Sequence, residues 1–149
     1  MTELLNMCWQ NFEKNLSDSL KEFRYEFTDV TLVCDDDQIE AHKIILSSSS
    51  LFFKRIFKRN KQTHPIVILE GLKTKMFKNI LDYIYTGEAT VETEDLESFL
   101  KCAGGLEIKQ LYVPDPTGIV SSVLGSSSFG QQLSPESVEQ SRASSVAGT

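Results

Sequence analysis

Residues 27–51 read FTDVTLVCDDDQIEAHKIILSSSSL, and this stretch decides the fold. Apolar side chains recur at every second position through Val30, Leu32 and Cys34, which predicts a strand. The polar run 35–38 is typical of a tight turn, after which the alternation resumes in a second strand. From Lys43 the apolar residues change to helical spacing. The stretch therefore predicts a hairpin of two strands followed directly by a helix.

The flanking sequence adds helices on both sides and one more strand. Apolar residues three to four positions apart predict an amphipathic first helix over 4–23. The serines at 47–50 favour a helix start over a helix interior, so they predict a break between a short helix and a second helix over about 49–59. The apolar run 66–69 predicts a short buried strand.

The segment after this strand predicts further short helices. One helix follows Lys73 and ends at Gly87, a residue suited to the left-handed position at a helix terminus. A short strand at 90–91 and a helix N-capped by Thr93 follow, with an interruption at the glycines 104–105 and a last turn over 106–112. This irregular order predicts an α+β fold, a small mixed sheet capped by a bundle of short helices.

Composition divides the chain near residue 112. Residues 1–112 carry the periodic apolar positions of one domain, whereas 113–149 are dense in Ser, Gly and Gln and predict a disordered tail. The net charge of −6 offers no electrostatic footprint for a phosphate backbone, so we expect no direct binding of nucleic acid. The chain of 149 residues is too short for two ordinary domains.

The cysteines predict neither a disulfide framework nor a metal site. Cys8, Cys34 and Cys102 are odd in number, widely spaced and without a C-x-x-C pair. We therefore expect no metal and no cofactor. The N-terminus lacks a signal-peptide core and no apolar run reaches about 18 residues, so we expect an intracellular protein that does not contact a membrane.

Several motifs together resemble one family. The opening stretch resembles the start of a BTB/POZ domain, and SLFF at 50–53, LDYIYTGE at 81–88 and the segment 99–111 match later motifs of that family in order. HPIVIL at 64–69 is similar to the tramtrack and longitudinals-lacking branch of insect transcription factors. The resemblance implies a protein-interaction domain that dimerises through an N-terminal helix and is not an enzyme.

The candidate dimer interface is the apolar face of the predicted first helix. It consists of Leu4, Leu5, Cys8, Trp9, Phe12 and Leu16. This face packs either on its own domain or, as the resemblance implies, on a second copy. Burial of about five such side chains yields roughly 7–15 kcal/mol per subunit. A two-fold contact doubles this to about 15–30 kcal/mol, against an association cost of about 4–15 kcal/mol.

Charged residues supply two further candidates. Asp29 and Lys43 are by residue type a turn-favouring acid and a solvated base, but the resemblance implies a charged pocket at the dimer groove. The basic cluster is either a solvated helix face or a nuclear-import or partner-docking patch. Its members are Lys54, Arg55, Lys58, Arg59 and Lys61.

Three residues are expected to have structural roles. His42 is expected to be a hydrogen-bonded structural histidine, because the sequence shows no set of an acid and a nucleophile for it to act with as a general base. Tyr83 and Gly87 belong to the LDYIYTGE motif.

The resemblance implies a homodimerisation or heterodimerisation module of a nuclear transcription regulator. Its expected partners are itself, related BTB proteins and corepressor or chromatin proteins, with the nucleus as the main location and the cytoplasm as a second one. The alternatives are a substrate adaptor of a cullin-type ubiquitin ligase and a finger-less isoform that competes with full-length relatives. The loop 58–63 lacks the apolar-x-Glu motif that such adaptors tend to carry.

Overall fold

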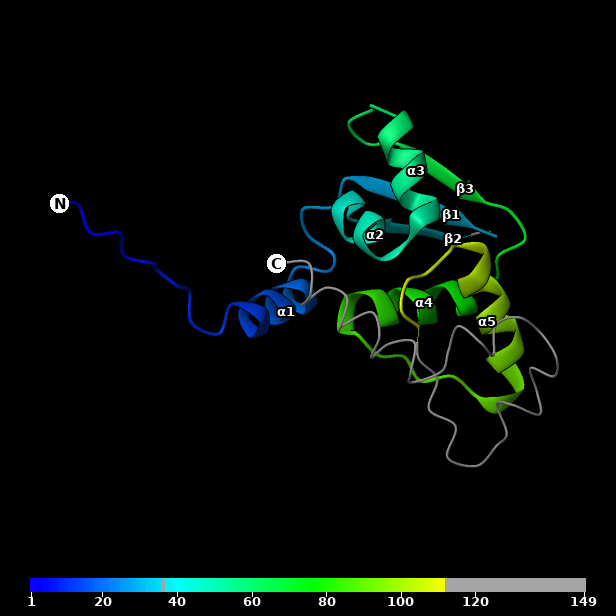
Figure 1. Cartoon of the computed structure of the whole chain (residues 1–149). Coiled ribbons are helices and arrows are strands. Elements are labelled where there is room, and N and C mark those ends of the chain that lie inside the picture. Colours follow the sequence, from blue (N-terminus) through cyan, green and yellow to red (C-terminus); the bar gives the residue numbers. More distant parts are fainter. Residues whose placement is uncertain (36, 112–149) are drawn as a thin grey trace.

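The computed structural model describes residues 1–35 and 37–111, and the predicted disordered tail at 113–149 lies outside the described residues. The predicted α+β class is confirmed, since a small sheet packs with short helices (Figure 1). In chain order the elements are α1 (Phe12–Glu22), β1 (Val30–Cys34), β2 (Asp37–Ala41), α2 (Lys43–Ser49), α3 (Leu51–Arg59), β3 (Ile66–Leu69), α4 (Thr74–Thr86), a 3-10 turn (Thr93–Asp95) and α5 (Leu96–Gly105).

The predicted hairpin supplies β1 and β2 of a mixed sheet with the strand order β2-β1-β3, in which β1 is the central strand. Strand β1 is antiparallel to β2 and parallel to β3. The connection in the hairpin is shorter than predicted, because Cys34 already pairs with Asp37, and Gln38 lies within β2. The alternation in β1 is confirmed: Val30, Leu32 and Cys34 are fully buried and the residues between them are half-buried.

Strand β3 corrects the prediction of a fully buried strand. Its Ile66 and Ile68 are 67% and 68% exposed, whereas Leu69 is buried. Ile66 and Ile68 alternate with the half-buried Val67 and the buried Leu69, so they share the face of the strand that no described residue buries. An unbroken apolar run does not distinguish this arrangement from burial on both faces.

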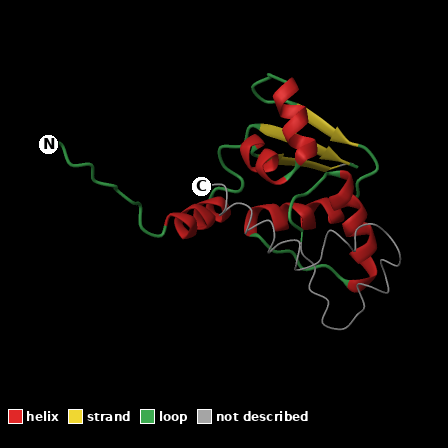
Figure 2. Cartoon of the chain, in the orientation of Figure 1, coloured by secondary structure: helices red, strands yellow, loops and turns green. Residues whose placement is uncertain are grey.

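The buried core contains residues of both the sheet and the helices. Helices form most of the regular structure, as Figure 2 shows. The largest fully buried side chains include Phe53 of α3, Leu46 of α2 and Phe77 of α4. Helix α4 contacts α1, α2 and α5 and is the hub of the helical part. It ends at Gly87, which has a φ of 85° and whose N–H donates to the Tyr83 carbonyl at 2.9 Å. The predicted left-handed helix end is therefore confirmed.

The first helix is shorter than predicted. Helix α1 begins at Phe12, and residues 1–9 have no regular structure and extend away from the body (Figure 1). Leu4 and Leu5 are 94% and 82% exposed. Apolar spacing alone was insufficient here, because an amphipathic helix gains most of its stability from packing and this segment has no surface to pack on within one chain.

The C-terminal part of the domain differs from the prediction in three places. Residues 90–91 form no strand, and Thr93 lies in the 3-10 turn without a side-chain cap. Helix α5 continues through the glycines to Gly105, because its buried Phe99, Leu100 and Ala103 anchor it to the core. The residues 106–111 form turns rather than a helix, with a bridge between Ser50 and Ile108.

Candidate functional site

The structure brings the predicted charged residues Asp29 and Lys43 together, but not as an ion pair. Asp29 Oδ1 accepts a hydrogen bond from the backbone N–H of Lys43 at 2.7 Å, at the first residue of α2. This carboxylate therefore caps the helix, where the positive end of the helix dipole favours an anion. The Lys43 ammonium instead donates to the carbonyls of Gln62 and Thr63, at 2.7 and 3.1 Å. It ties α2 to the loop before β3.

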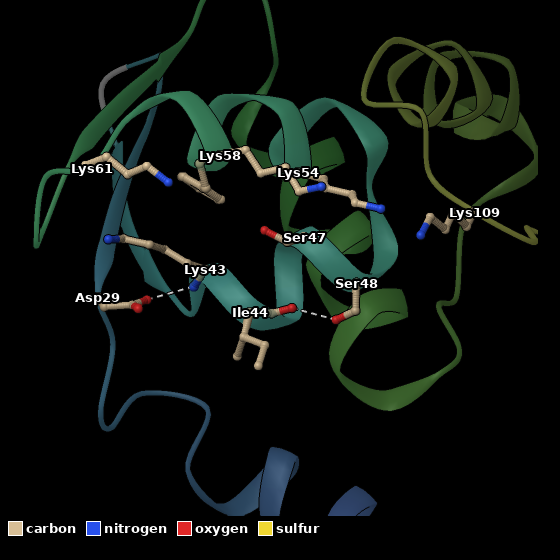
Figure 3. Close-up of a pocket in the computed structure, with 10 residues that line it drawn as sticks. Asp29, Lys43, Ile44, Ser47, Ser48, Lys54, Lys58, Lys61 and Lys109 are labelled. Carbon is tan, nitrogen blue, oxygen red and sulfur yellow. Dashed lines mark hydrogen bonds between the residues drawn. The ribbon is translucent and has the colours of Figure 1, made fainter.

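Both residues line an open basin of about 690 Å³ on the surface of α2 and α3. In Figure 3 Lys43 and Lys61 lie at one end, Lys54 and Lys109 at the other, and Ser47 lies between them. We call this surface the lysine basin. Its lining consists of Asp29, Lys43, Ile44, Ser47, Ser48, Lys54, Phe57, Lys58, Lys61 and Lys109.

The predicted basic patch divides into two parts. Lys54, Lys58 and Lys61 line the basin, where Lys54 and Lys58 are one helical turn apart on α3. Arg55 instead forms a bidentate ion pair with Glu107, with N–O distances of 2.8 and 2.5 Å. The hydrogen bond from Arg55 lowers the pKa of the Glu107 carboxyl below its ordinary value. Arg59 is exposed and does not line the basin.

A turn after α5 delivers Lys109 to the basin. The backbone N–H of Leu51 donates to the Glu107 carbonyl at 3.2 Å, and the N–H of Lys109 donates to the Ser49 carbonyl at 2.8 Å. The hydroxyl of Tyr83 donates to the carbonyl of Gln110 at 3.0 Å. The first two bonds fasten the segment 107–110 to the junction of α2 and α3, and the bond from Tyr83 fastens it to α4.

The sequence places Ser50 at a helix break and in the SLFF motif, but it does not indicate the contacts that this residue makes. It is fully buried between α2 and α3. Its Oγ donates to the Leu106 carbonyl at 2.5 Å and accepts from the Phe53 N–H at 3.2 Å, as the N-cap of α3. The N-cap was readable from the Ser-x-x-Phe spacing, whereas the bond to Leu106, 56 residues away, left no local signal.

His42 is a structural residue in the geometry that surrounds it. Its Nε2 lies 2.5 Å from the Glu26 carbonyl, which only accepts, so Nε2 carries the proton. Nδ1 then accepts from the Tyr85 hydroxyl at 2.7 Å, and the same oxygen accepts from the His42 backbone N–H at 3.0 Å. Burial raises the pKa of the Tyr85 hydroxyl. This arrangement fastens the strand-to-helix junction to α4 and the segment before β1.

The predicted dimer-interface residues are all exposed in the single chain. Trp9, Phe12 and Leu16 are 64%, 50% and 47% exposed, and Trp9 packs edge-to-face on Phe12 with ring centroids 5.1 Å apart. Cys8 is also exposed. We call this surface the N-terminal apolar segment. It consists of Leu4, Leu5, Cys8, Trp9, Phe12 and Leu16.

Arg24 joins the end of α1 to the body of the domain, where α1 also contacts α4. Arg24, which follows α1, forms an ion pair with Asp82 of α4 at 2.7 Å and lies 5.3 Å from the ring centroid of Tyr85. No sequence signal identified Arg24. Its contacts leave the outer surface of α1 open.

The part of the chain that the structure describes contains no cluster of three or more metal-ligating side chains. Within the same residues no helix has the length and apolarity that crossing a bilayer requires.

Comparisons with known proteins agree with the predicted resemblance. A family model described as the BTB/POZ domain matches residues 18–113. The Drosophila melanogaster Longitudinals lacking protein-like is 40% identical over 105 residues, 69% of this chain and 83% of that protein. Protein abrupt of the same organism is 41% identical over 105 residues, also 69% of this chain, but the match spans only 12% of that longer protein. The predicted likeness to the tramtrack and longitudinals-lacking proteins is confirmed.

The fold is also that of a solved structure. The BTB domain of human gigaxonin superposes with a TM-score of 0.61 at 25% identity, covering 71% of this chain and 89% of that one.

Proposed function

The chain belongs to the BTB/POZ family, and from that premise we propose that it is a self-associating interaction module of a nuclear transcription regulator. Residues 1–112 are the dimerisation domain in this proposal. It pairs with a second copy or with related BTB proteins and recruits corepressor or chromatin partners. The proposal assigns no reaction to the chain, in keeping with a family of interaction domains.

The observation that carries the self-association is the exposure of the N-terminal apolar segment. Groups of large exposed apolar side chains mark interaction sites in soluble proteins. Leu4, Leu5 and Trp9 are 94%, 82% and 64% exposed in the single chain. Burial of each such side chain contributes about 1.5–3 kcal/mol. In a two-fold contact each of these side chains is buried once per copy, so its contribution is doubled. The doubled sum offsets an association cost of about 4–15 kcal/mol.

The arrangement of α1 favours a second copy as the partner. The inner side of α1 contacts α4, where Arg24 holds it, while Phe12 and Leu16 stay half exposed. In a two-fold dimer these outer side chains meet their own counterparts. In this proposal α1 supplies the main contact surface, and residues 4–9 add further apolar area.

Co-purification of two differently tagged full-length copies tests the self-association. We expect one tag to capture the other copy, and the double variant L5D/W9D to lose this capture. Both side chains are exposed, so the variant keeps its fold, which circular dichroism checks. A control variant that removes two exposed charges elsewhere, E94Q/K101Q, is expected to keep the capture. Failure of the unmodified chain to capture itself contradicts the proposal.

A reporter assay tests the role in transcription separately. The full chain fused to a heterologous DNA-binding domain is expected to change expression from a promoter carrying that domain's sites. A fusion that leaves expression unchanged contradicts the regulatory role. Specific capture of a cullin by the chain favours the alternative of a ubiquitin-ligase adaptor. The loop after α3, with Lys61 and no acidic residue over 58–63, argues against that alternative.

A further inference from the structure

The lysine basin concentrates positive charge on a chain whose net charge is −6. Five lysines and one carboxylate line it. The lysines come from four separate parts of the chain: α2, α3, the loop after α3 and the turn after α5. The fold therefore assembles this charge, and only the part from α3 and its loop is visible as a run in the sequence.

The basin lysines are not neutralised by neighbouring carboxylates. Among residues 1–35 and 37–111, ion pairs include Lys75, Lys78 and Lys101 but none of the five basin lysines. Asp29, the one carboxylate in the lining, already accepts from the Lys43 amide. Lys54 and Lys58 lie one helical turn apart, a spacing at which like charges repel. An anion placed in the basin relieves that repulsion.

Apolar and hydroxyl groups lie among the charges. Phe57 stacks on Phe53 at a centroid distance of 5.8 Å through one ring face, and it also lines the basin. Ile44 is 76% exposed at the margin. The hydroxyl of Ser47 forms no hydrogen bond with any described residue, and Figure 3 shows it between the lysines. The basin therefore combines lysine ammonium groups with the apolar side chains of Phe57 and Ile44.

We propose that the lysine basin binds a short acidic segment of a partner protein. Carboxylates of the segment meet the ammonium groups of Lys54, Lys58 and Lys61, and an apolar side chain contacts Phe57. The inference rests on the proposed role as an interaction module, whose partner it characterises chemically. It does not depend on the N-terminal apolar segment.

A peptide fits this surface better than a nucleic acid. The open volume of about 690 Å³ accommodates a few residues rather than a long groove-tracking strand. Two arginines lie next to basin lysines in the sequence: Arg55 is engaged by Glu107, and Arg59 does not line the basin. The overall charge of −6 also repels an extended polyanion, whereas a short acidic segment interacts mainly with the local field.

Fluorescence anisotropy with the full chain tests the proposal. The probe is a labelled eight-residue peptide in which glutamate alternates with leucine. The comparison peptide has glutamine in place of each glutamate. We expect the glutamate peptide to bind at least tenfold more tightly, with affinity that falls as salt is raised. The triple variant K54Q/K58Q/K61Q is expected to weaken this binding at least tenfold.

The matched control K73Q/K78Q/K101Q removes the same formal charge at exposed lysines outside the basin, and its affinity is expected to stay within twofold of the unmodified chain. Equal weakening by both triple variants overturns the proposal, as does equal binding of the two peptides or tighter binding of an eight-nucleotide single strand. Sedimentation of K54Q/K58Q/K61Q separates the two claims, because self-association is expected to be unchanged when peptide binding is lost.

Discussion

Single side chains hold this small domain together at junctions that the sequence separates widely. Ser50 joins the start of α3 to the end of α5, and His42 joins the start of α2 to Tyr85 of α4. Ser50 supplies a donor for the Leu106 carbonyl in the buried interior, and His42 links the Tyr85 hydroxyl to the Glu26 carbonyl. Substitutions at such residues are therefore expected to affect stability more than their size suggests.

Ser50→Ala is expected to destabilise the domain by about 2–3 kcal/mol, since it removes a helix cap and leaves the Leu106 carbonyl without its donor. Urea unfolding measures this change in free energy. Ser48→Ala is the matched control, because Ser48 is exposed and bonds only to its own helix, and we expect a change below about 0.5 kcal/mol. Equal losses in the two variants contradict the assigned role of Ser50.

Cys34 is expected to be the least reactive of the three thiols. It is fully buried in β1, and burial, assisted by the charges of Asp35 and Asp37, raises the pKa of its thiol to about 11. Very little thiolate forms near neutral pH, and the thiolate is the reactive species. Mass spectrometry after maleimide labelling compares its rate with that of the half-buried Cys102. Labelling of Cys34 as fast as Cys102 in the folded protein contradicts this burial.

The helices and strands differ in how far their sequence determined them. The β1–β2 hairpin and α4 were predictable because a local period coincides with burial, and Gly87 marked the end of α4. The start of α1 and the exposure of β3 were not, since both depend on what packs against the element. The same holds for the lysine basin: Lys54, Lys58 and Lys61 were visible as a cluster, whereas Lys43 and Lys109 join them through tertiary contacts.

Gly87→Ala tests the end of α4. The φ of 85° is a left-handed conformation that alanine adopts at a cost of about 1–2 kcal/mol, although open space surrounds the position. We expect the free energy of unfolding to fall by that amount, and the melting temperature to fall with it. Gly105→Ala, at the last residue of α5 and also without close neighbours, is expected to be neutral or stabilising. A stabilised G87A variant contradicts the assigned backbone role.

The connection between α3 and the turn after α5 is expected to depend on pH. Hydrogen bonding from Arg55 lowers the pKa of Glu107 in the folded chain. A carboxyl with a lowered folded pKa contributes stability above its unfolded pKa, and this contribution is lost as the pH falls through the folded value. Glu107→Gln is therefore expected to unfold more easily than the unmodified chain at pH 7, with the difference shrinking toward pH 3. A difference that is constant over this range contradicts the linkage.

At the scale of the whole molecule, the domain has two surfaces with opposite character. The N-terminal apolar segment is suited to a contact that two-fold symmetry doubles, and the lysine basin is suited to a charged segment of another protein. The two surfaces share no residue, so one copy can use both at once. This separation lets self-association and partner binding be altered independently by substitution.

Sedimentation equilibrium of the full chain at tens of micromolar tests self-association directly. We expect twice the mass of one chain, and a return to the single-chain mass in the variant W9D/F12D with its circular dichroism unchanged. Both side chains are at least half exposed in the single chain, so the substitutions act on the contact between copies rather than on the fold. A single-chain mass for the unmodified protein, or a dimer that W9D/F12D leaves intact, would contradict self-association through the N-terminal apolar segment.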